Sequence, residues 1–230
     1  MHGWILGFAA IAAASIAFAA PGDDDDANTT PCPRGNAVVV ERFISAECAA
    51  CWTDASTARP RADEWLLDWI VPSSRGDEAP LSSAAPPEAR ARAGRALRSA
   101  PGGDRASVQR SAAHSASPLQ LRVAAGPAWN GYFGVQIDAS GRAAAGSSVW
   151  VALVEVVEAG TDGTPVPRQL VRTVSGPLPA DELRDGQPWQ HLLAMRWPET
   201  AKPARLRARA WIEDARGRII AMAGERCGTR

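Results

Sequence analysis

The sequence has no excess of charge of either sign, and this limits the partners that it can attract. Its 230 residues include 25 Lys or Arg and 25 Asp or Glu, so the formal net charge at pH 7 is zero. A neutral chain has no long-range electrostatic attraction for nucleic acid or for an anionic membrane surface. We therefore expect neither nucleic acid nor a membrane surface among its partners.

The sequence also lacks the short motifs of several protein classes. It contains no G-x-S-x-G, no phosphate-binding glycine loop and no H-E-x-x-H, so it has no signature of a serine hydrolase, a nucleotide-binding protein or a zinc protease. A zinc site would need a second closely spaced pair of ligands, and His114 and His191 each stand alone. We expect no metal ion and no cofactor.

The first residues have the composition of a secretory signal. Residues 1–20 form an apolar run that contains a small-x-small cleavage site at residues 17–19. We expect residues 1–19 to be removed and residues 20–36 to form a disordered acidic leader. A membrane anchor is the alternative, although the run is at the short end for a span. The remaining chain is expected to be periplasmic or secreted, without a membrane span.

The strongest chemical signal is a pair of cysteines that follows an apolar strand. Residues 38–44 are rich in β-branched side chains, and Cys48 and Cys51 follow as a C-x-x-C motif with two alanines between them. This order is typical of a thioredoxin-like redox turn. At the start of a helix, the Cys48 sulfur would meet backbone N–H groups and the positive end of the helix dipole, which favour the thiolate. We therefore predict Cys48 as the nucleophile and Cys51, one turn deeper, as the resolving thiol.

The same pair has a second interpretation, in which its disulfide only staples the turn. Thioredoxin-like enzymes hold a cis-proline loop against the two cysteines, where it aligns the substrate. The pair Thr164-Pro165 lies far along the chain from Cys51, among predicted strands, and we interpret it as a plain turn proline. The sequence therefore leaves both a catalytic and a structural role open for the C-x-x-C motif.

Two further cysteines, Cys32 and Cys227, stand near the two ends of the expected folded region. An exported chain keeps its disulfides, and the number of cysteines is even. Once Cys48 and Cys51 are paired by proximity, Cys32 and Cys227 are left for each other. We predict a structural disulfide between them, which would close a long loop and stabilise the fold by several kcal/mol.

The N-terminal part of the expected fold is a thioredoxin-like core at residues 37–71. Its first strand is followed by a helix that could continue into residues 53–63, and then by a second apolar strand at residues 65–71. Residues 72–118 are rich in Ala, Ser, Pro, Arg and Gly. Because such a stretch buries too little apolar surface to form strands, we expect a solvated helix over residues 87–98 and a flexible linker.

Residues 119–227 are predicted to form a β-sandwich. Seven short segments with alternating patterns follow one another without a long helix between them, as in antiparallel sheets. The clearest segment, residues 206–214, turns back into residues 218–224 as a hairpin. Trp211 lies on the arginine-bearing side of this strand and is a candidate for a binding surface. The predicted fold class is α+β, with a reduced thioredoxin-like βαβ part followed by an antiparallel β-sandwich.

The segment VVVERFISAECAAC, at residues 38–51, is similar to the VVELFTSQGCSSC opening of a secreted bacterial family, the domain-of-unknown-function 1223 family. The strands from SSVWVALVEVV to RQLVRTV also look like the second domain of that family. The resemblance implies a thioredoxin-like domain joined to a C-terminal β-sandwich. This sequence departs from the family at Trp52-Thr53, where members have two prolines, and in lacking the Tyr-Thr-Pro strand between Arg98 and Pro118.

These observations support two functional hypotheses. In the first, an exported thiol–disulfide oxidoreductase uses Cys48 and Cys51 to exchange disulfides with other exported proteins, and the sandwich serves as a docking module. In the second, the protein is a non-enzymatic envelope protein. Its C-x-x-C disulfide is then structural, and the surface of the sandwich binds a partner.

Overall fold

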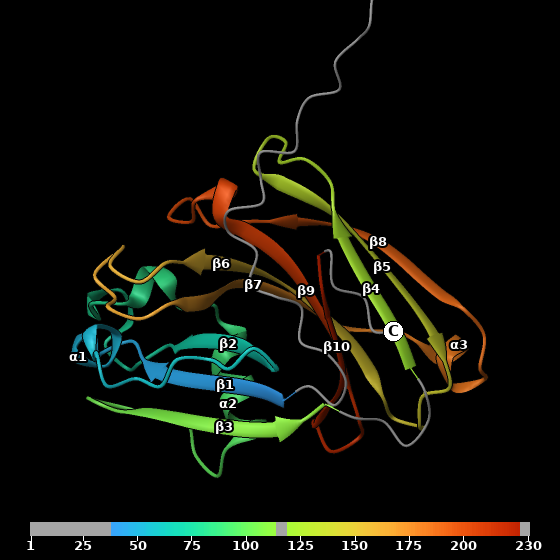
Figure 1. The fold of residues 1–230 in the computed structure, drawn as a ribbon, viewed down its shortest axis with the longest axis horizontal. Helices are drawn as coiled ribbons and strands as arrows, with labels where there is room; N and C mark the ends of the chain where they lie inside the picture. The colour runs from blue at the N-terminus through green and yellow to red at the C-terminus, as the bar shows by residue number, and fades with distance from the viewer. Residues whose placement is uncertain (1–37, 114–118, 226–230) are drawn as a thin grey trace, which may run out of the picture. The chain divides into compact units, whose positions relative to one another are not determined.

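The computed structural model describes residues 38–113 and 119–225, which lie within one compact unit, Pro31–Arg230. The predicted signal, the acidic leader and the predicted Cys32–Cys227 disulfide fall outside the described residues. The described chain is mostly β-structure, in a seven-stranded sheet and a three-stranded sheet with a few short helices (Figure 1). Among the helices of these residues, none is long and apolar enough to cross a membrane.

The seven-stranded sheet contains strands from both halves of the chain. In order across the sheet, the strands are β10 (Ile219–Gly224), β9 (Leu206–Glu213), β6 (Ser148–Val157), β7 (Arg168–Leu178), β2 (Glu64–Val71), β1 (Val38–Ser45) and β3 (Ala106–Ala112). The strands β6, β7, β9 and β10 pair antiparallel with their neighbours, and β7 then pairs parallel with β2. The predicted boundary between a thioredoxin-like segment and a sandwich segment therefore does not separate two sheets.

The strands β1 and β2 are parallel neighbours, and helix α1 (Ala49–Thr53) lies in the connection between them. Almost every residue of both strands is buried, which explains why each forms a nearly continuous apolar run instead of an alternating pattern. The expected continuation of the helix into residues 53–63 is wrong. Asp54 accepts hydrogen bonds from the backbone N–H and the hydroxyl of Ser56, at 2.8 and 2.9 Å, and the chain leaves the helix there.

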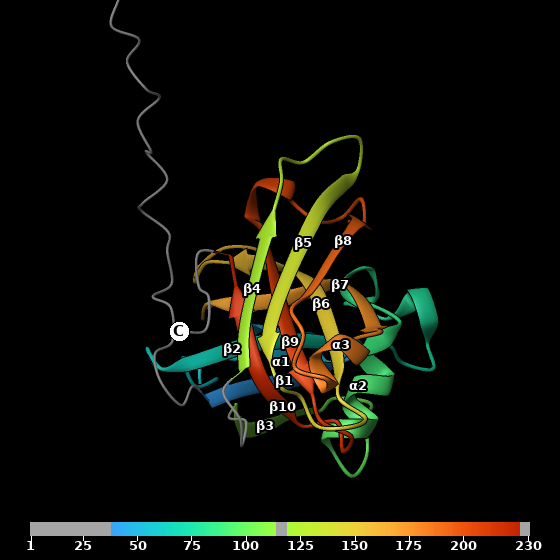
Figure 2. The same cartoon turned by 90° about the vertical axis from the view of Figure 1, so that its right-hand side faces the viewer.

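The three-stranded sheet consists of β4 (Leu119–Ala125), β5 (Tyr132–Gly141) and β8 (Trp189–Arg196), which pair antiparallel. Figure 2 shows these strands side by side. On β4, buried and exposed residues alternate, and the buried face shares one apolar core with residues of β6, β9 and β10. The two sheets thus pack face to face through this core, as in a sandwich, but the larger sheet continues beyond it into β7, β2, β1 and β3.

Residues 72–113 contain more structure than the sequence predicted. Helix α2 (Glu88–Ala96) lies within the predicted helix, but it is not simply solvated, because Ala89, Arg92 and Ala93 are buried against the large sheet. The expectation of a linker without strands is wrong for β3. Its residues alternate between half-buried and exposed, and β3 is held by its backbone ladder to β1, which requires no run of large apolar side chains.

The remaining helices are short and join the strands. They are the 3-10 helices η2 (Gly76–Glu78), η3 (Ser82–Ala84) and η4 (Pro203–Arg205) and the single-turn helix α3 (Asp181–Arg184).

Trp211 does not belong to a binding surface. Its side chain is 1% exposed and stacks on Trp150, with ring centroids 6.4 Å apart. Its indole N–H donates to Glu213 at 2.8 Å. The side of β9 that carries it faces the core under α2, so both faces of this strand are buried.

Candidate functional site

Cys48 and Cys51 are joined by a disulfide, with their Cα atoms 5.3 Å apart. The chain reaches them directly from β1, which ends at Ser45, and the Cys48 N–H donates to the Ser45 carbonyl at 2.9 Å. Cys48 is the N-cap of α1, and its Sγ accepts a hydrogen bond from the Cys51 N–H at 3.1 Å. The cysteines predicted from the sequence are therefore brought together at the end of a buried strand.

The two cysteines differ in exposure, in the order opposite to the one expected. Cys48 is only 2% exposed, whereas Cys51 is partly exposed. The C-x-x-C motif predicts Cys51 one turn deeper than Cys48, as in a long helix that runs into the protein. Because α1 has only five residues, it makes a single turn, and the contribution of its dipole is limited to that turn.

The segment that follows β2 helps to bury Cys48. Ala79 belongs to the same buried apolar cluster as Cys48, and Leu81 packs against this cluster. The Leu81 N–H donates to the Ala46 carbonyl at 3.0 Å, which ties the segment to the loop between β1 and α1. Residues that were predicted to belong to a flexible linker thus form part of the cysteine site.

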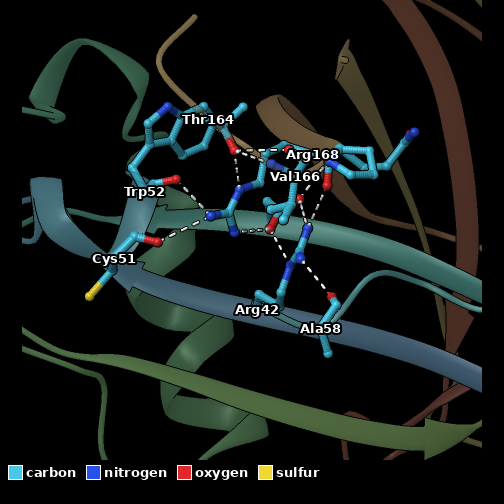
Figure 3. Close-up of polar contacts among 10 residues, drawn as sticks. Arg42, Cys51, Trp52, Ala58, Thr164, Val166 and Arg168 are labelled. Atoms are coloured by element: carbon cyan, nitrogen blue, oxygen red, sulfur yellow. Dashed lines mark hydrogen bonds and ion pairs between the residues drawn. The ribbon is translucent and has the colours of Figure 1, made fainter. Parts of the chain in front are cut away.

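Arg168, the first residue of β7, holds the other end of helix α1. Its Nη2 donates to the carbonyl oxygens of Cys51 and Trp52, at 3.1 and 2.8 Å, and its Nε donates to the Thr164 hydroxyl at 3.0 Å (Figure 3). The last carbonyls of a helix have no hydrogen-bond donor within the helix, and Arg168 donates to two of these carbonyls. The guanidinium also lies 5.1 Å from the centroid of the Trp52 ring. Arg168 is 1% exposed, and burial lowers its pKa even though the charge of Asp68 opposes this effect.

A buried carboxylate, Asp68 on β2, links Arg168 to the neighbouring strand. Asp68 accepts two hydrogen bonds from Arg42 on β1, at 2.5 and 2.8 Å, and one from the backbone N–H of Gln169, at 2.7 Å. The Arg168 guanidinium lies 3.7 Å from the same carboxylate. This Arg42–Asp68–Arg168 cluster is almost fully buried and carries one more positive than negative charge.

Sequence reasoning missed this cluster, although part of it left a signal. Arg42 and Asp68 are residues of opposite charge inside two largely apolar strands, and buried charges need partners. That rule could have paired the two strands. The contact from Arg168 to Cys51 spans 117 positions, and nothing in the local sequence of either residue indicates it.

Trp52 stands where the family with the similar opening motif has its first proline after the cysteines, and it anchors α1. Its indole N–H donates to the Asp162 carbonyl at 2.8 Å, and the side chain is 9% exposed. The Asp162 carboxylate binds Lys202 at 2.6 Å and Arg205 at 2.5 Å. The hydrogen bond from Lys202 is the main reason that the pKa of Asp162 lies below its ordinary value. Trp52 therefore fixes the loop before β7 against the cysteine site.

The same loop contains Thr164-Pro165, which is far from the cysteines along the chain. In the folded protein the loop lies close to the cysteines, because Arg168 donates hydrogen bonds both to the Thr164 hydroxyl and to the Cys51 carbonyl. Thr164 is 1% exposed. The Thr164–Pro165 peptide bond is trans, since Gly176–Pro177 is the only cis bond within residues 38–113 and 119–225. Pro165 is therefore not a cis-proline beside the cysteines, and it lies in a loop that borders the site.

A strand does occupy the interval in which the Tyr-Thr-Pro strand of the family was not found. β3 begins at Ala106, and the Ser45 N–H donates to the Arg105 carbonyl at 3.0 Å. Its first residues thus lie beside the end of β1, three positions before Cys48, but they include no proline.

In the part of the chain that the structure describes, no group of three or more His, Cys, Asp or Glu side chains could hold a metal ion. The predicted structural pair Cys32 and Cys227 lies outside that part.

Comparisons with known proteins identify no family. A scan against protein-family models finds no match, and a search of curated proteins finds none either. Among solved structures, the chain is similar to HBP35 of Porphyromonas gingivalis, with a TM-score of 0.44 and 11% sequence identity. That similarity covers 84% of this chain and 76% of the other chain.

Proposed function

We propose that this protein exchanges disulfides with other proteins through Cys48 and Cys51. The observation that carries the proposal is the Cys48–Cys51 disulfide at the start of α1, directly after β1, with one sulfur-bearing residue buried and the other partly exposed. A bond that joins such residues across one helical turn can be opened by an external thiolate and closed again by the partner cysteine.

We further propose that β1, α1, β2 and β3 form a shortened thioredoxin-like core, with fewer strands and helices than a full thioredoxin fold. The parallel pairing of β1 with β2, the intervening α1 with its C-x-x-C motif and the antiparallel pairing of β3 with β1 support this proposal. The similarity of residues 38–51 to the domain-of-unknown-function 1223 family points in the same direction.

The proposed place of action is the periplasm or the extracellular space. Disulfides persist in these compartments and are rare in the cytosol. The apolar N-terminal run and the Cys48–Cys51 disulfide support this location. The substrates would then be thiols or disulfides of other exported proteins.

A second candidate function is that of a non-enzymatic envelope protein with a structural C-x-x-C disulfide. Two observations favour it: Cys48 lies in an apolar cluster and is 2% exposed, and Trp129, at the tip of the β4–β5 hairpin, is 81% exposed. Under this alternative the disulfide would staple the turn, and the three-stranded sheet would bind a partner through its exposed aromatic tip.

A transfer experiment separates the two candidates. The oxidised protein is mixed with a reduced peptide that contains two cysteines, and the peptide disulfide is measured with time by mass spectrometry. We expect one peptide disulfide per protein, formed faster than with the same concentration of glutathione disulfide. The Cys48→Ser/Cys51→Ser variant retains Cys32 and Cys227 and is the matched control. A wild-type rate no higher than that of this variant would overturn the proposal of disulfide exchange.

A further inference from the structure

The Cys48–Cys51 disulfide is asymmetric toward solvent. Cys48 is 2% exposed within an apolar cluster that includes Ile44 and Ile70, whereas Cys51 packs against the edge of the same cluster and is partly exposed. An incoming thiolate must approach the sulfur that it attacks, opposite the sulfur that leaves. An attacking thiolate can reach Cys48 only if the apolar residues around it move aside. It can reach Cys51 with a smaller displacement, because Cys51 is partly exposed.

The polar contacts of Cys51 leave its side chain free of the charged cluster. Its carbonyl oxygen accepts a hydrogen bond from Arg168, and its N–H donates to the Cys48 sulfur. Figure 3 shows the Cys51 sulfur directed away from Arg168, Trp52 and Thr164. Arg168 therefore holds the Cys51 backbone through its carbonyl, while the Cys51 sulfur points away from Arg168.

The hydrogen bond at Cys48 favours this residue as the leaving sulfur. When the disulfide opens, one sulfur departs with the bonding electron pair and becomes a thiolate. The Cys51 N–H lies 3.1 Å from the Cys48 Sγ and is already placed to stabilise negative charge there. No corresponding hydrogen bond to the Cys51 sulfur is found among residues 38–113 and 119–225.

We propose that an external thiol enters at Cys51, and that Cys48 is the leaving and resolving sulfur, which is the reverse of the order expected from the sequence. This inference rests on the proposed disulfide exchange. The thiolate of a protein or peptide attacks the Cys51 Sγ, and the bond between the two sulfurs breaks. The products are a mixed disulfide on Cys51 and a thiolate on Cys48.

The second step completes the transfer without any other reactant. A second thiolate of the same substrate attacks the substrate sulfur of the mixed disulfide and releases Cys51 as a thiolate. The substrate has then lost two electrons and formed its disulfide, and Cys48 and Cys51 have gained the two electrons as a dithiol once they take protons from water. In the opposite direction, the Cys51 thiolate attacks a substrate disulfide and Cys48 resolves the mixed species.

The test uses the matched variants Cys48→Ala and Cys51→Ala, each of which leaves one cysteine of the pair. Both are reacted with glutathione disulfide, and mixed disulfides are located by peptide mapping, which separates them from those at Cys32 and Cys227. We expect Cys51 to react about tenfold faster than Cys48, because reactivity follows access to the thiolate. The same reactions in denaturant give the intrinsic rates, which should be similar. Equal rates in the folded variants, or a faster Cys48, would overturn the proposal.

A measurement on the wild-type protein avoids any effect of the substitutions on folding. The oxidised protein is exposed briefly to a peptide with a single cysteine, the reaction is quenched with acid, and the mixed disulfide is mapped. We expect the peptide on Cys51, and its predominance on Cys48 would contradict the inference. If Cys51 reacts first but the two-cysteine peptide is not oxidised, disulfide exchange as a function fails while the order of attack holds.

Discussion

Two buried charge clusters lie on opposite faces of the same sheet, and they differ in what their arginines bind. Glu41 and Arg42 are neighbours in β1, so their side chains point to opposite faces. On one face, the Arg42–Asp68–Arg168 cluster has two arginines for one carboxylate. On the other, Arg92 of α2 pairs with Glu41 at 2.5 Å and with Glu213 at 2.7 Å.

In the cluster around Arg92 the charges balance, because Arg95 of the same helix also lies 3.6 Å from Glu213 and gives two arginines for two carboxylates. Burial acts to lower the pKa of Arg92, but its hydrogen bonds and the charges of Glu41 and Glu213 outweigh burial and raise it. The two carboxylates also accept indole hydrogen bonds from Trp69 and Trp211, at 3.1 and 2.8 Å. This cluster joins α2 to β1 and β9 of the large sheet, and its ion pairs and hydrogen bonds serve to hold these elements together.

The cluster around Arg168 is less fully compensated and reaches the cysteines. Burial lowers the pKa of Arg168 below its ordinary value despite the charge of Asp68. The guanidinium donates two hydrogen bonds to the carbonyls of Cys51 and Trp52. A buried ion cluster serves the fold when each of its arginines is matched by a carboxylate, as around Arg92. An arginine left in excess can position a reactive turn instead.

The largest effect is expected from Arg92→Met. This substitution leaves Glu41 buried without a cation and Glu213 with only its 3.6 Å contact to Arg95, and removal of one partner from such a cluster costs about 3–5 kcal/mol. The free energy of unfolding in urea measures the loss. Arg98→Met, at an exposed position just beyond the same helix, is the control and should change it by less than about 0.5 kcal/mol. A loss below about 1 kcal/mol for Arg92→Met would contradict a structural role for this cluster.

Arg168→Met should give a smaller loss of stability together with a change at the disulfide. Asp68 keeps its bonds to Arg42 and Gln169, so we expect a loss of about 1–3 kcal/mol from the unpaired carbonyls and hydroxyl. Because Cys51 is then less firmly held near Cys48, the disulfide should be less stable and the reduction potential should become less negative by about 30 mV.

Arg172→Met is the matched control for Arg168→Met. Arg172 is also buried on β7, where it pairs with Glu155 at 3.5 Å. Its substitution should destabilise the protein and leave the reduction potential unchanged. If both variants shift the potential equally, Arg168 has no specific role in positioning Cys51.

Trp52→Phe tests the link between α1 and the loop before β7. The substitution keeps an aromatic ring over Arg168 and removes the hydrogen bond to the Asp162 carbonyl. We expect the free energy of unfolding to fall by about 1 kcal/mol. Trp129→Phe, at a position that is 81% exposed, should change it by less than about 0.5 kcal/mol. Equal effects of the two substitutions would show that the indole bond is not a significant anchor.

The smallest effect concerns pH and Asp162. Because its folded pKa is lowered from 3.8, mainly by Lys202, its contribution to stability is present above about pH 4 and is lost as the pH falls through the folded pKa. Asp162→Asn should therefore reduce stability at pH 7 by less than about 1 kcal/mol, since the pair is exposed. Asn also tolerates the positive φ of 46° at this position.

Unfolding curves from pH 7 to pH 2 provide the check. The difference between wild type and Asp162→Asn should disappear at the acidic end. Asp77→Asn, at an exposed position, should show no such convergence. A difference that stays constant with pH would assign the effect to something other than the charge of Asp162.

The sequence predicted the parts of the fold that depend on neighbouring residues. The apolar runs correctly indicated β1 and β2, and Pro87 correctly marked the start of α2, of which it is the N-cap. The cysteine spacing predicted the disulfide. What could not be predicted depends on contacts between distant segments, such as the parallel pairing of β2 with β7 and the approach of Arg168 to Cys51.

The exposure of the two cysteines could not be predicted for a similar reason. The motif alone implied a helix that carries Cys51 inward, but Asp54 ends that helix after five residues. A segment then packs back from beyond β2 onto the cluster that contains Cys48. Composition had indicated a linker there, because alanine and proline form few recognisable patterns even when they are buried.

The reduction potential of the Cys48–Cys51 pair tests disulfide exchange most directly. The purified protein is equilibrated in glutathione buffers, and the free thiols are trapped and assigned to each cysteine by peptide mapping. We expect a value between about −120 and −270 mV, the range of proteins that exchange disulfides. A value below about −300 mV would contradict the proposed function and identify a structural disulfide.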